Sequence, residues 1–251
     1  MQLLERESIP SFILSLIYRF TYRKYNLIAV SKGIFDDIKK GKLVGKNKLL
    51  FLVENKLNLN LFKPKPKLSK DFISVVYIAR IGYPKAHADL IHAWSKLSHI
   101  PNKKLFLVGP DGLNNQIHQL AKQLVPDNSI VFTGPQFQIA DLLNECDFAV
   151  FPSHKEGLPI ALLEKMAMEL PVVVSNIKEL TSIIKNNVNG LVFECGNIDD
   201  LAKKITILLQ DEKLRKKLGF QARKTVEERF GSSNIALANE KVYEEVITDR
   251  L

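Results

Sequence analysis

The chain has 251 residues, of which 46% are apolar and 25% charged, and this globular composition excludes a disordered or collagen-like protein. Its 36 lysines and arginines exceed its 27 aspartates and glutamates, so the net charge of +9 favours anionic partners such as phosphorylated ligands, lipid head groups or nucleic acid. Cys146 and Cys195 are too few for a disulfide framework and lack metal-ligand spacing. We therefore expect a cytoplasmic protein without a secretory signal, and the early uncharged run at 8–18 is too short to span a bilayer.

The first 61 residues offer few regular elements. Apolar residues such as Phe20 alternate there with basic residues such as Arg23. The pattern is compatible with a helix lying on the anionic inner face of a membrane, and equally with a helix whose apolar stripe packs against the protein. One helix pair and short strands at 27–30 and 49–53 are expected there, which is too little for an independent Rossmann domain.

Residues 62–70 are predicted to form an extended linker. The stretch from Phe62 to Lys70 contains two prolines and several like charges and has no apolar periodicity, which is typical of a linker. A domain boundary is expected there.

From residue 71 to residue 230, short β-branched runs alternate with longer amphipathic stretches. This alternation predicts an α/β fold, with a Rossmann-like parallel sheet and flanking helices. The strands are expected at 73–78, 105–108, 130–132, 148–151, 172–174 and 191–193. The helices are expected at 88–97, 113–124, 138–145, 160–168 and 198–209. Two closing helices are expected at 212–224 and 234–247, the second within a terminal segment at 231–251.

The loop after the first of these strands carries two cations, Arg80 and Lys85, just before a predicted helix. Ligands of a doubly wound sheet bind at the carboxyl ends of the strands. Two cations there can neutralise a diphosphate, and the helix N-terminus adds backbone donors. The alternative is that both are ordinary solvated loop charges.

A second loop combines two carboxylates with a glycine and a proline. Gly157 permits close approach of the backbone to a ligand, and Pro159 suits the first turn of a helix. Glu156 then lies just before the helix and Glu164 on its second turn. Each carboxylate can accept two hydrogen bonds from a vicinal diol, so the pair suits a nucleotide sugar. The alternative is two solvent-exposed glutamates.

The loop after the predicted strand at 130–132 contains Gly134, Pro135 and Gln136. It could offer polar groups to a nucleobase, but Gly-Pro is also a general turn signal.

These motifs together resemble a known enzyme family. The run Pro152-Ser-His-Lys-Glu-Gly-Leu-Pro-Ile-Ala-Leu-Leu-Glu-Lys-Met-Ala-Met-Glu-Leu-Pro-Val-Val173 is similar to the pattern PSxxEGxPxxxLEAMAxGxPVV of retaining GT-B glycosyltransferases of family GT4. Arg80 and Lys85 match the family's R-x4-K pair, and His87 matches a histidine that often follows it. Phe132-Thr-Gly and Ile28-Ala-Val-Ser31 also resemble family segments.

The resemblance implies a role for each matching residue. Catalytic roles fall to Arg80 and Lys85, on the diphosphate of the donor, and to Glu156, on the transferred sugar. Glu164 would bind the ribose hydroxyls. The other donor-binding residues implied are Gln136, Gly157, Leu158 and Pro159. The donor would be a nucleotide sugar such as a UDP- or GDP-sugar, and no metal or other cofactor is expected.

Departures from the family pattern include Ala79, Ala86 and Glu169. Ala79 and Ala86 stand where the family has glycines around the Arg-Lys loop, and Glu169 replaces a glycine just after the motif helix. Alanine in place of glycine is a mild change unless φ is positive there. The segment 54–58 also departs from the family's Pro-Asn-Gly-Val-Asp turn.

The length of the chain leaves little room for the family's N-terminal, acceptor-binding Rossmann domain, so 1–61 is expected to be a remnant of it. We expect an acceptor domain from a partner chain, a homodimer or a membrane contact, on a face that includes Leu16, Phe20, Val242 and Val246. The expected activity is transfer of a sugar, with retention, to a saccharide or lipid-linked acceptor in polysaccharide or lipopolysaccharide biosynthesis.

Alternative functions were weighed against this one. A non-catalytic or degenerate nucleotide-sugar-binding subunit would keep the donor site and lose the acceptor side. A 2-epimerase on the same architecture would need carboxylates and histidines set for proton abstraction, which the sequence does not show. Nucleic-acid binding rests on net charge alone, and no nucleic-acid partner is expected.

Overall fold

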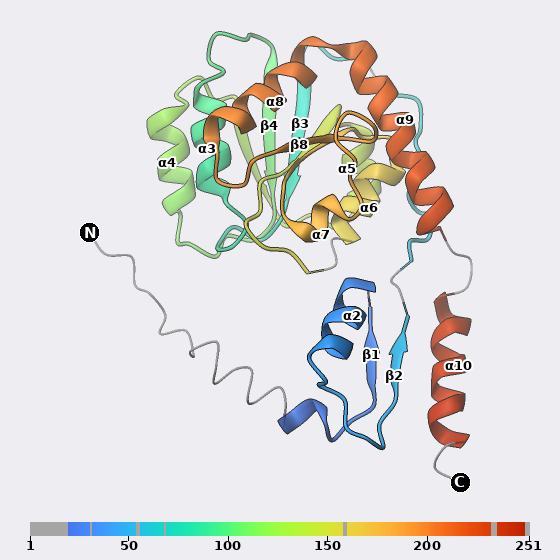
Figure 1. The fold of residues 1–251 in the computed structure, drawn as a ribbon. Coiled ribbons are helices and arrows are strands. Elements are labelled where there is room, and N and C mark those ends of the chain that lie inside the picture. The colour runs from blue at the N-terminus through green and yellow to red at the C-terminus, as the bar shows by residue number, and fades with distance from the viewer. Residues whose placement is uncertain are drawn as a thin grey trace. The chain divides into compact units, whose positions relative to one another are not determined.

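The computed structural model describes residues 20–30, 32–53, 56–67, 69–157, 160–231 and 235–248. The chain divides into two compact units, one of Met1–Lys56 with Ser233–Leu251 and the other of Leu57–Ser232. Figure 1 shows the fold.

The smaller unit is built on a pair of parallel strands. β1 (Leu27–Ala29) pairs with β2 (Leu50–Leu52), and α2 (Lys32–Lys40) connects them, as a parallel pair requires a crossover. α10 (Ile235–Thr248) belongs to the same unit. Both strands lie where the sequence predicts them.

The face expected to meet a partner is only partly exposed. Phe20 is 69% exposed, whereas Val242 is buried and Val246 half-buried. Leu16 lies outside the described residues, as does most of the basic, apolar segment before residue 20. The burial of Val242 removes it from the face proposed for a partner.

The larger unit contains a parallel sheet of six strands in the order β5-β4-β3-β6-β7-β8. The strands are β3 (Ile73–Ile78), β4 (Lys103–Val108), β5 (Ile130–Gly134), β6 (Phe148–Phe151), β7 (Val172–Ser175) and β8 (Leu191–Phe193). The predicted α/β fold with a Rossmann-like parallel sheet is confirmed.

Helices cover both faces of this sheet (Figure 1). One layer holds α3 (His87–Ser95), α4 (Gln116–Leu124) and α8 (Ile198–Gln210), and the other holds α5 (Ile139–Asn144), α6 (Ile160–Ala167) and α9 (Glu212–Arg229). A single-turn helix, α7 (Lys178–Thr181), follows β7. α2 lies in the segment where a helix pair is expected from the sequence, whereas α7 is not predicted.

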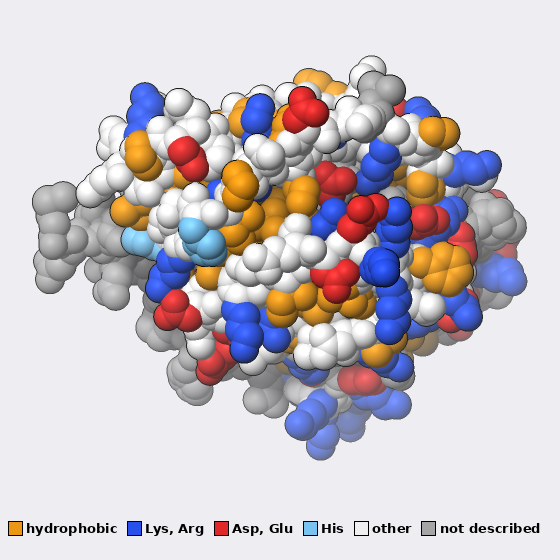
Figure 2. All heavy atoms as spheres, turned by 90° about the horizontal axis from the view of Figure 1, so that it is seen from above, with side chains coloured by type: hydrophobic (Ala, Val, Ile, Leu, Met, Phe, Trp, Pro, Cys, Tyr) orange, Lys and Arg blue, Asp and Glu red, His pale blue; other side chains and the backbone are white. Residues whose placement is uncertain are grey.

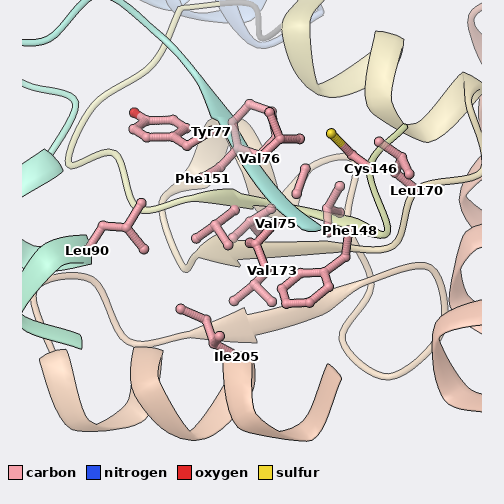
Figure 3. Close-up of a cluster of buried hydrophobic side chains, with 14 of the residues drawn as sticks. Val75, Val76, Tyr77, Leu90, Cys146, Phe148, Phe151, Leu170, Val173 and Ile205 are labelled. Carbon is pink, nitrogen blue, oxygen red and sulfur yellow. The ribbon is translucent and has the colours of Figure 1, made fainter. Parts of the chain in front are cut away.

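The core lies between the sheet and its helices. Every residue of β6 and β7 is buried, and both strands are continuous apolar runs apart from Ser175. Such runs are typical of a parallel sheet covered on both faces. Figure 3 shows Val75, Phe148 and Val173 from three neighbouring strands packed together, with Ile205 of α8 against them.

The segment predicted as a linker is fixed to the larger unit. The Lys65 N–H donates to Asn144 Oδ1 at 2.8 Å, and its ammonium group donates to Asp141 Oδ1 at 2.8 Å. The division between the units falls after Lys56, ahead of the predicted boundary at 62–70. The reason is that the proline-rich stretch is extended but hydrogen-bonded along α5.

The strand order locates the binding crevice of the larger unit. The chain runs outward through β3, β4 and β5, then crosses back to β6 and continues in the opposite direction. The direction therefore reverses between β3 and β6, and the loops that leave these two strands diverge at their carboxyl ends. Ligands of this fold bind at such a point, so the site is sought in the loops after β3 and β6.

Candidate functional site

The loop after β3 is held against the loop after β4. The Ile81 N–H donates to the Pro110 carbonyl at 2.9 Å, and the Gly112 N–H donates to the Ile81 carbonyl at 3.0 Å. Gly109 has a φ of +143°, and a Cβ there would be 2.2 Å from the Ala79 carbonyl oxygen. Only glycine permits this approach, which fixes the start of the loop that carries Arg80 and Lys85.

Lys85, in the loop after β3, and Glu156, in the loop after β6, form an ion pair. Lys85 Nζ lies 2.6 Å from Glu156 Oε2, with side-chain exposures of 28% and 10%. The other oxygen, Glu156 Oε1, accepts a hydrogen bond from Ser153 Oγ at 2.6 Å. Two of the residues predicted for the site thus contact each other, and the carboxylate is fixed at both oxygens.

Buried hydroxyl groups support this pair from below. Tyr77 OH donates to the Lys85 carbonyl at 2.8 Å and lies 3.1 Å from Ser153 Oγ. Ser175 Oγ donates to the Ser153 carbonyl at 2.6 Å. Burial raises the pKa of Tyr77 far above its usual range, so its hydroxyl stays protonated and remains a donor. β3, the loop after β6, and β7 each contribute one residue to the support.

Two histidines reinforce the same region. His87 is buried against the Tyr77 ring, with the ring centroids 4.8 Å apart. Burial lowers its pKa to about 4, with a smaller contribution from the charge of Lys85, so this imidazole is neutral near pH 7. The His154 N–H donates to the Pro84 carbonyl at 2.9 Å, and its ring lies 2.7 Å from Asp89. His154 therefore ties the two loops together.

The other predicted site residues are less closely grouped. Arg80 is exposed and has no hydrogen bond or ion pair within the described ranges, and its Nε would lie 3.7 Å from a Cβ added at Gly112. Gln136 is also exposed, and its side-chain amide donates to the Thr133 carbonyl at 3.1 Å. Neither side chain contacts the pair in this structure. Leu158 and Pro159 lie outside the described residues.

Gly157 and Glu164 surround the start of α6. No described atom lies within 4 Å of the position a Cβ would take at Gly157, so there is open space for a ligand beside its backbone. Glu164 lies on the second turn of α6 with 22% of its side chain exposed, and its Oε2 lies 3.5 Å from Lys165 Nζ. It has no other polar contact within the part of the chain that the structure describes.

This arrangement can bind an anion next to a polyol. An ammonium group has three N–H donors, and Lys85 uses one on Glu156, so two remain for a phosphate. Glu164 retains a free carboxylate oxygen for hydroxyl groups. No cluster of three or more His, Cys, Asp or Glu side chains within the described ranges could hold a metal ion.

A cavity of about 610 Å³ lies at the opposite, amino end of the strands. Figure 2 shows this end of the molecule, where basic and acidic side chains surround hydrophobic hollows. Its charged lining residues are Lys65, Lys67, Lys70, Arg215, Lys216, Asp71, Asp147, Glu169 and Glu212.

The cations of this cavity already have partners. Lys67 donates to the Cys146 carbonyl, Lys70 to the Glu145 carbonyl, and Arg215 to the Leu208 carbonyl at 2.5 Å. These carbonyls lie at or just after the C-terminal ends of α5 and α8. The crossover helices run antiparallel to the strands, so their C-termini, with the negative ends of the helix dipoles, lie at the amino ends of the strands. The cations thus cap helices, and the better candidate site is the one at the carboxyl ends.

Comparison with known proteins identifies the family. Residues 60–225, which include β3 to β8, match the family described as glycosyl transferases group 1. The chain belongs to this family. A relative in this family, N-acetyl-alpha-D-glucosaminyl L-malate synthase of Bacillus anthracis, is 29% identical over 194 residues, which cover 77% of this chain and 51% of the relative.

Two further comparisons extend the family assignment. The capsular polysaccharide biosynthesis glycosyltransferase CapM of Staphylococcus aureus is 28% identical over 231 residues, covering 87% of this chain and 61% of CapM. The chain therefore spans about half to three fifths of the length of these relatives. The crystal structure of Anabaena HepE in complex with UDP-glucose superposes with a TM-score of 0.78 at 21% identity, covering 98% of this chain and 70% of HepE, which supports the GT-B fold.

Several residues of the site in this member of the glycosyl transferases group 1 family were not predicted from the sequence. Tyr77 lies within β3 and Ser175 is the last residue of β7, and in the sequence both look like ordinary positions of buried strands. Ser153 stands within the quoted motif, so its place beside Glu156 had a sequence signal. Lys165 also had a sequence signal, because the family pattern has alanine at that position.

Proposed function

We propose that residues 57–232 bind a nucleotide-sugar donor, and that the protein transfers the sugar with retention to a saccharide or lipid-linked acceptor. The Lys85–Glu156 ion pair at the reversal point of the sheet carries this proposal, because it puts a cation and a fixed carboxylate in the crevice where the fold binds ligands.

The cations serve the diphosphate. Lys85 keeps two N–H donors for the phosphates while it holds Glu156, and the exposed Arg80 side chain is in the same loop. Positive charge fixed next to a departing nucleoside diphosphate stabilises the charge that develops as the glycosidic bond breaks. In this scheme Arg80 and Lys85 perform a task that a metal ion performs elsewhere.

The carboxylates serve the hydroxyl groups of the donor. Glu156 is assigned to the transferred sugar, because it lies beside the cation that would hold the phosphates. Glu164, on the second turn of α6, is assigned to the ribose diol. Gly157 leaves space for the ligand between them, and the Gln136 loop is assigned to the nucleobase.

The acceptor and the cellular process are inferred from relatives. CapM is named for capsular polysaccharide biosynthesis, so we propose a saccharide or lipid-linked acceptor in cell-surface polysaccharide biosynthesis. The acceptor surface is assigned to elements outside residues 57–232, including a partner chain, a second copy or a membrane-surface contact. No described helix has the length and apolar character that a membrane span requires.

Calorimetric titration with a panel of nucleotide sugars tests donor binding. Lys85→Gln keeps a hydrogen-bond donor for Glu156 but removes the charge, and Glu164→Ala removes the proposed ribose acceptor. Each is expected to raise the Kd of the bound donor about tenfold or more, since a hydrogen bond to a charged group contributes about 1.5 to 3 kcal/mol. The matched controls are Lys216→Gln and Glu212→Ala, an exposed ion pair on α9.

The outcomes separate the alternatives. Unchanged Kd values in both site variants would show that the donor binds elsewhere. Donor binding at the site without sugar transfer to any acceptor, in the presence of a membrane extract and candidate partners, would favour the non-catalytic subunit. Sugar transfer to an acceptor by the purified chain alone would show that no partner chain is needed.

A further inference from the structure

Lys165 is a fully buried lysine in the second turn of α6. Its side chain is 0% exposed, and its ammonium group has no hydrogen-bond partner within the described part of the chain. Glu164 Oε2 lies 3.5 Å from this ammonium group. A buried charge without hydrogen bonds is costly, so the position calls for an explanation that packing does not supply.

The surroundings of this ammonium group are otherwise apolar or neutral. The Phe151 ring of β6 lies 5.9 Å from Nζ. Cys146 is the other titratable group that acts on Lys165, and burial raises the pKa of its thiol to about 12, so it remains neutral near pH 8. Glu164 is therefore the one group with a charge near pH 8 among those that act on Lys165 within the described ranges.

Residue 165 also differs from the family pattern. Alanine stands there in the sequence LEAMA, whereas this chain has LEKMA. The helix does not need a lysine at this point, and a long apolar side chain would avoid the cost of burying the charge. A role through Glu164 explains why a charged group is present.

We propose that Lys165 is a positioning residue for nucleotide binding, which holds one oxygen of the Glu164 carboxylate from inside the protein so that the other faces the ribose hydroxyls. This inference rests on the proposed function, because it takes Glu164 as the ribose-binding group. A carboxylate fixed before the ligand arrives loses less conformational freedom on binding. Lys165 itself does not contact the ligand.

The proposal has a pH dependence. Burial lowers the pKa of Lys165 to about 8, and the Glu164 charge opposes that shift. Below this pH the ammonium group is charged and holds the carboxylate. As the pH rises through about 8 the charge is lost, so affinity for the nucleotide falls and approaches that of a variant without the lysine.

The test is a double-mutant cycle with uridine diphosphate as the probe, measured by calorimetry at pH 7. Lys165→Met fills the same space without charge, and Glu164→Gln removes the charge of its partner. Lys165→Met is expected to raise the Kd about 5- to 20-fold, the size of effect typical for one charged contact. In the Glu164→Gln background, the same change is expected to move the Kd less than about twofold, because the partner is gone.

Thermal unfolding and a control variant separate positioning from support of the fold. Lys165→Met is expected to unfold at the same temperature as the parent or higher, since it removes a buried charge. Lys103→Met provides the control, because Lys103 is also buried but lies at the amino end of β4, where it donates to the Ile100 carbonyl at 2.7 Å. It is expected to leave the Kd unchanged.

The pH profile of the parent needs no variant of Lys165 and applies even if Lys165→Met fails to fold. The Kd of the parent is expected to rise between pH 7 and 8.5, while that of Glu164→Gln stays level apart from changes of the nucleotide itself. A level parent profile, or an unchanged Kd in Lys165→Met when Glu164→Gln weakens binding, overturns the role of Lys165 and leaves the proposed function intact. If Glu164→Gln also has no effect, the proposed donor site itself fails.

Discussion

Ser153→Ala tests whether the buried hydroxyl network holds Glu156 in place. The substitution removes one small, fully buried group and leaves the charges of Lys85 and Glu156 unchanged. It deletes the 2.6 Å hydrogen bond to Glu156 Oε1 and the 3.1 Å contact with Tyr77 OH. Tyr77 keeps its bond to the Lys85 carbonyl.

The expected loss of stability follows from these contacts. A hydrogen bond to a charged group contributes about 1.5 to 3 kcal/mol, and the 10% exposure of Glu156 lets water replace little of it. We expect the free energy of unfolding to fall by about 2 kcal/mol. For a unit of this size that corresponds to a decrease in Tm of roughly 4–8 °C.

The assay combines thermal unfolding with nucleotide-sugar titration. The loss of stability should become much smaller in a Glu156→Ala background, because the acceptor of the hydrogen bond is already missing. The donor Kd of Ser153→Ala should rise, since the carboxylate is no longer held at both oxygens. The reasoning is refuted if Ser153→Ala has the parent's Tm, or if its effect is equally large without Glu156.

Two other predictions concern backbone conformation and pH. Ala86 has a φ of +52° and Glu169 a φ of +57°, so Ala86→Gly and Glu169→Gly should each raise the Tm by about 2–4 °C for a gain near 1 kcal/mol. Ala79→Gly, at a residue without positive φ, should not raise the Tm. Equal changes of Tm in all three variants would contradict the argument from positive φ. His87 titrates near pH 4 in the folded protein but near its ordinary pKa, about 6.5, when unfolded. Stability should therefore decrease by up to about 3 kcal/mol as the pH falls from 6.5 to 4, and denaturant titrations of His87→Leu should lack that component.

The fold of the larger unit was predictable because its local signals agree. The apolar runs at 73–78, 148–151 and 191–193 match β3, β6 and β8 as observed, since buried parallel strands have a clear composition. The helices were less well bounded. The predicted helix at 113–124 begins only at Gln116, because Asp111 accepts hydrogen bonds from the Leu113 and Asn115 N–H groups and forms a turn there.

The site was only partly predictable, because side-chain contacts depend on the packing of distant strands. The sequence predicted that Lys85 and Glu156 lie in two loops that each lead into a helix, but not that they pair directly or that Tyr77 lies beneath them. The positive φ at Ala86 and Glu169 likewise appears only in the structure. It explains why glycine suits both positions in the family.

The most direct test of the central claim is a crystal structure of the protein soaked with the nucleotide sugar that binds best in titration. The account predicts the diphosphate within hydrogen-bonding distance, about 3 Å, of Lys85 Nζ at the carboxyl ends of β3 and β6, with the ribose at Glu164. A nucleotide bound instead in the cavity at the amino ends of the strands, against Lys70 and Arg215, would contradict it.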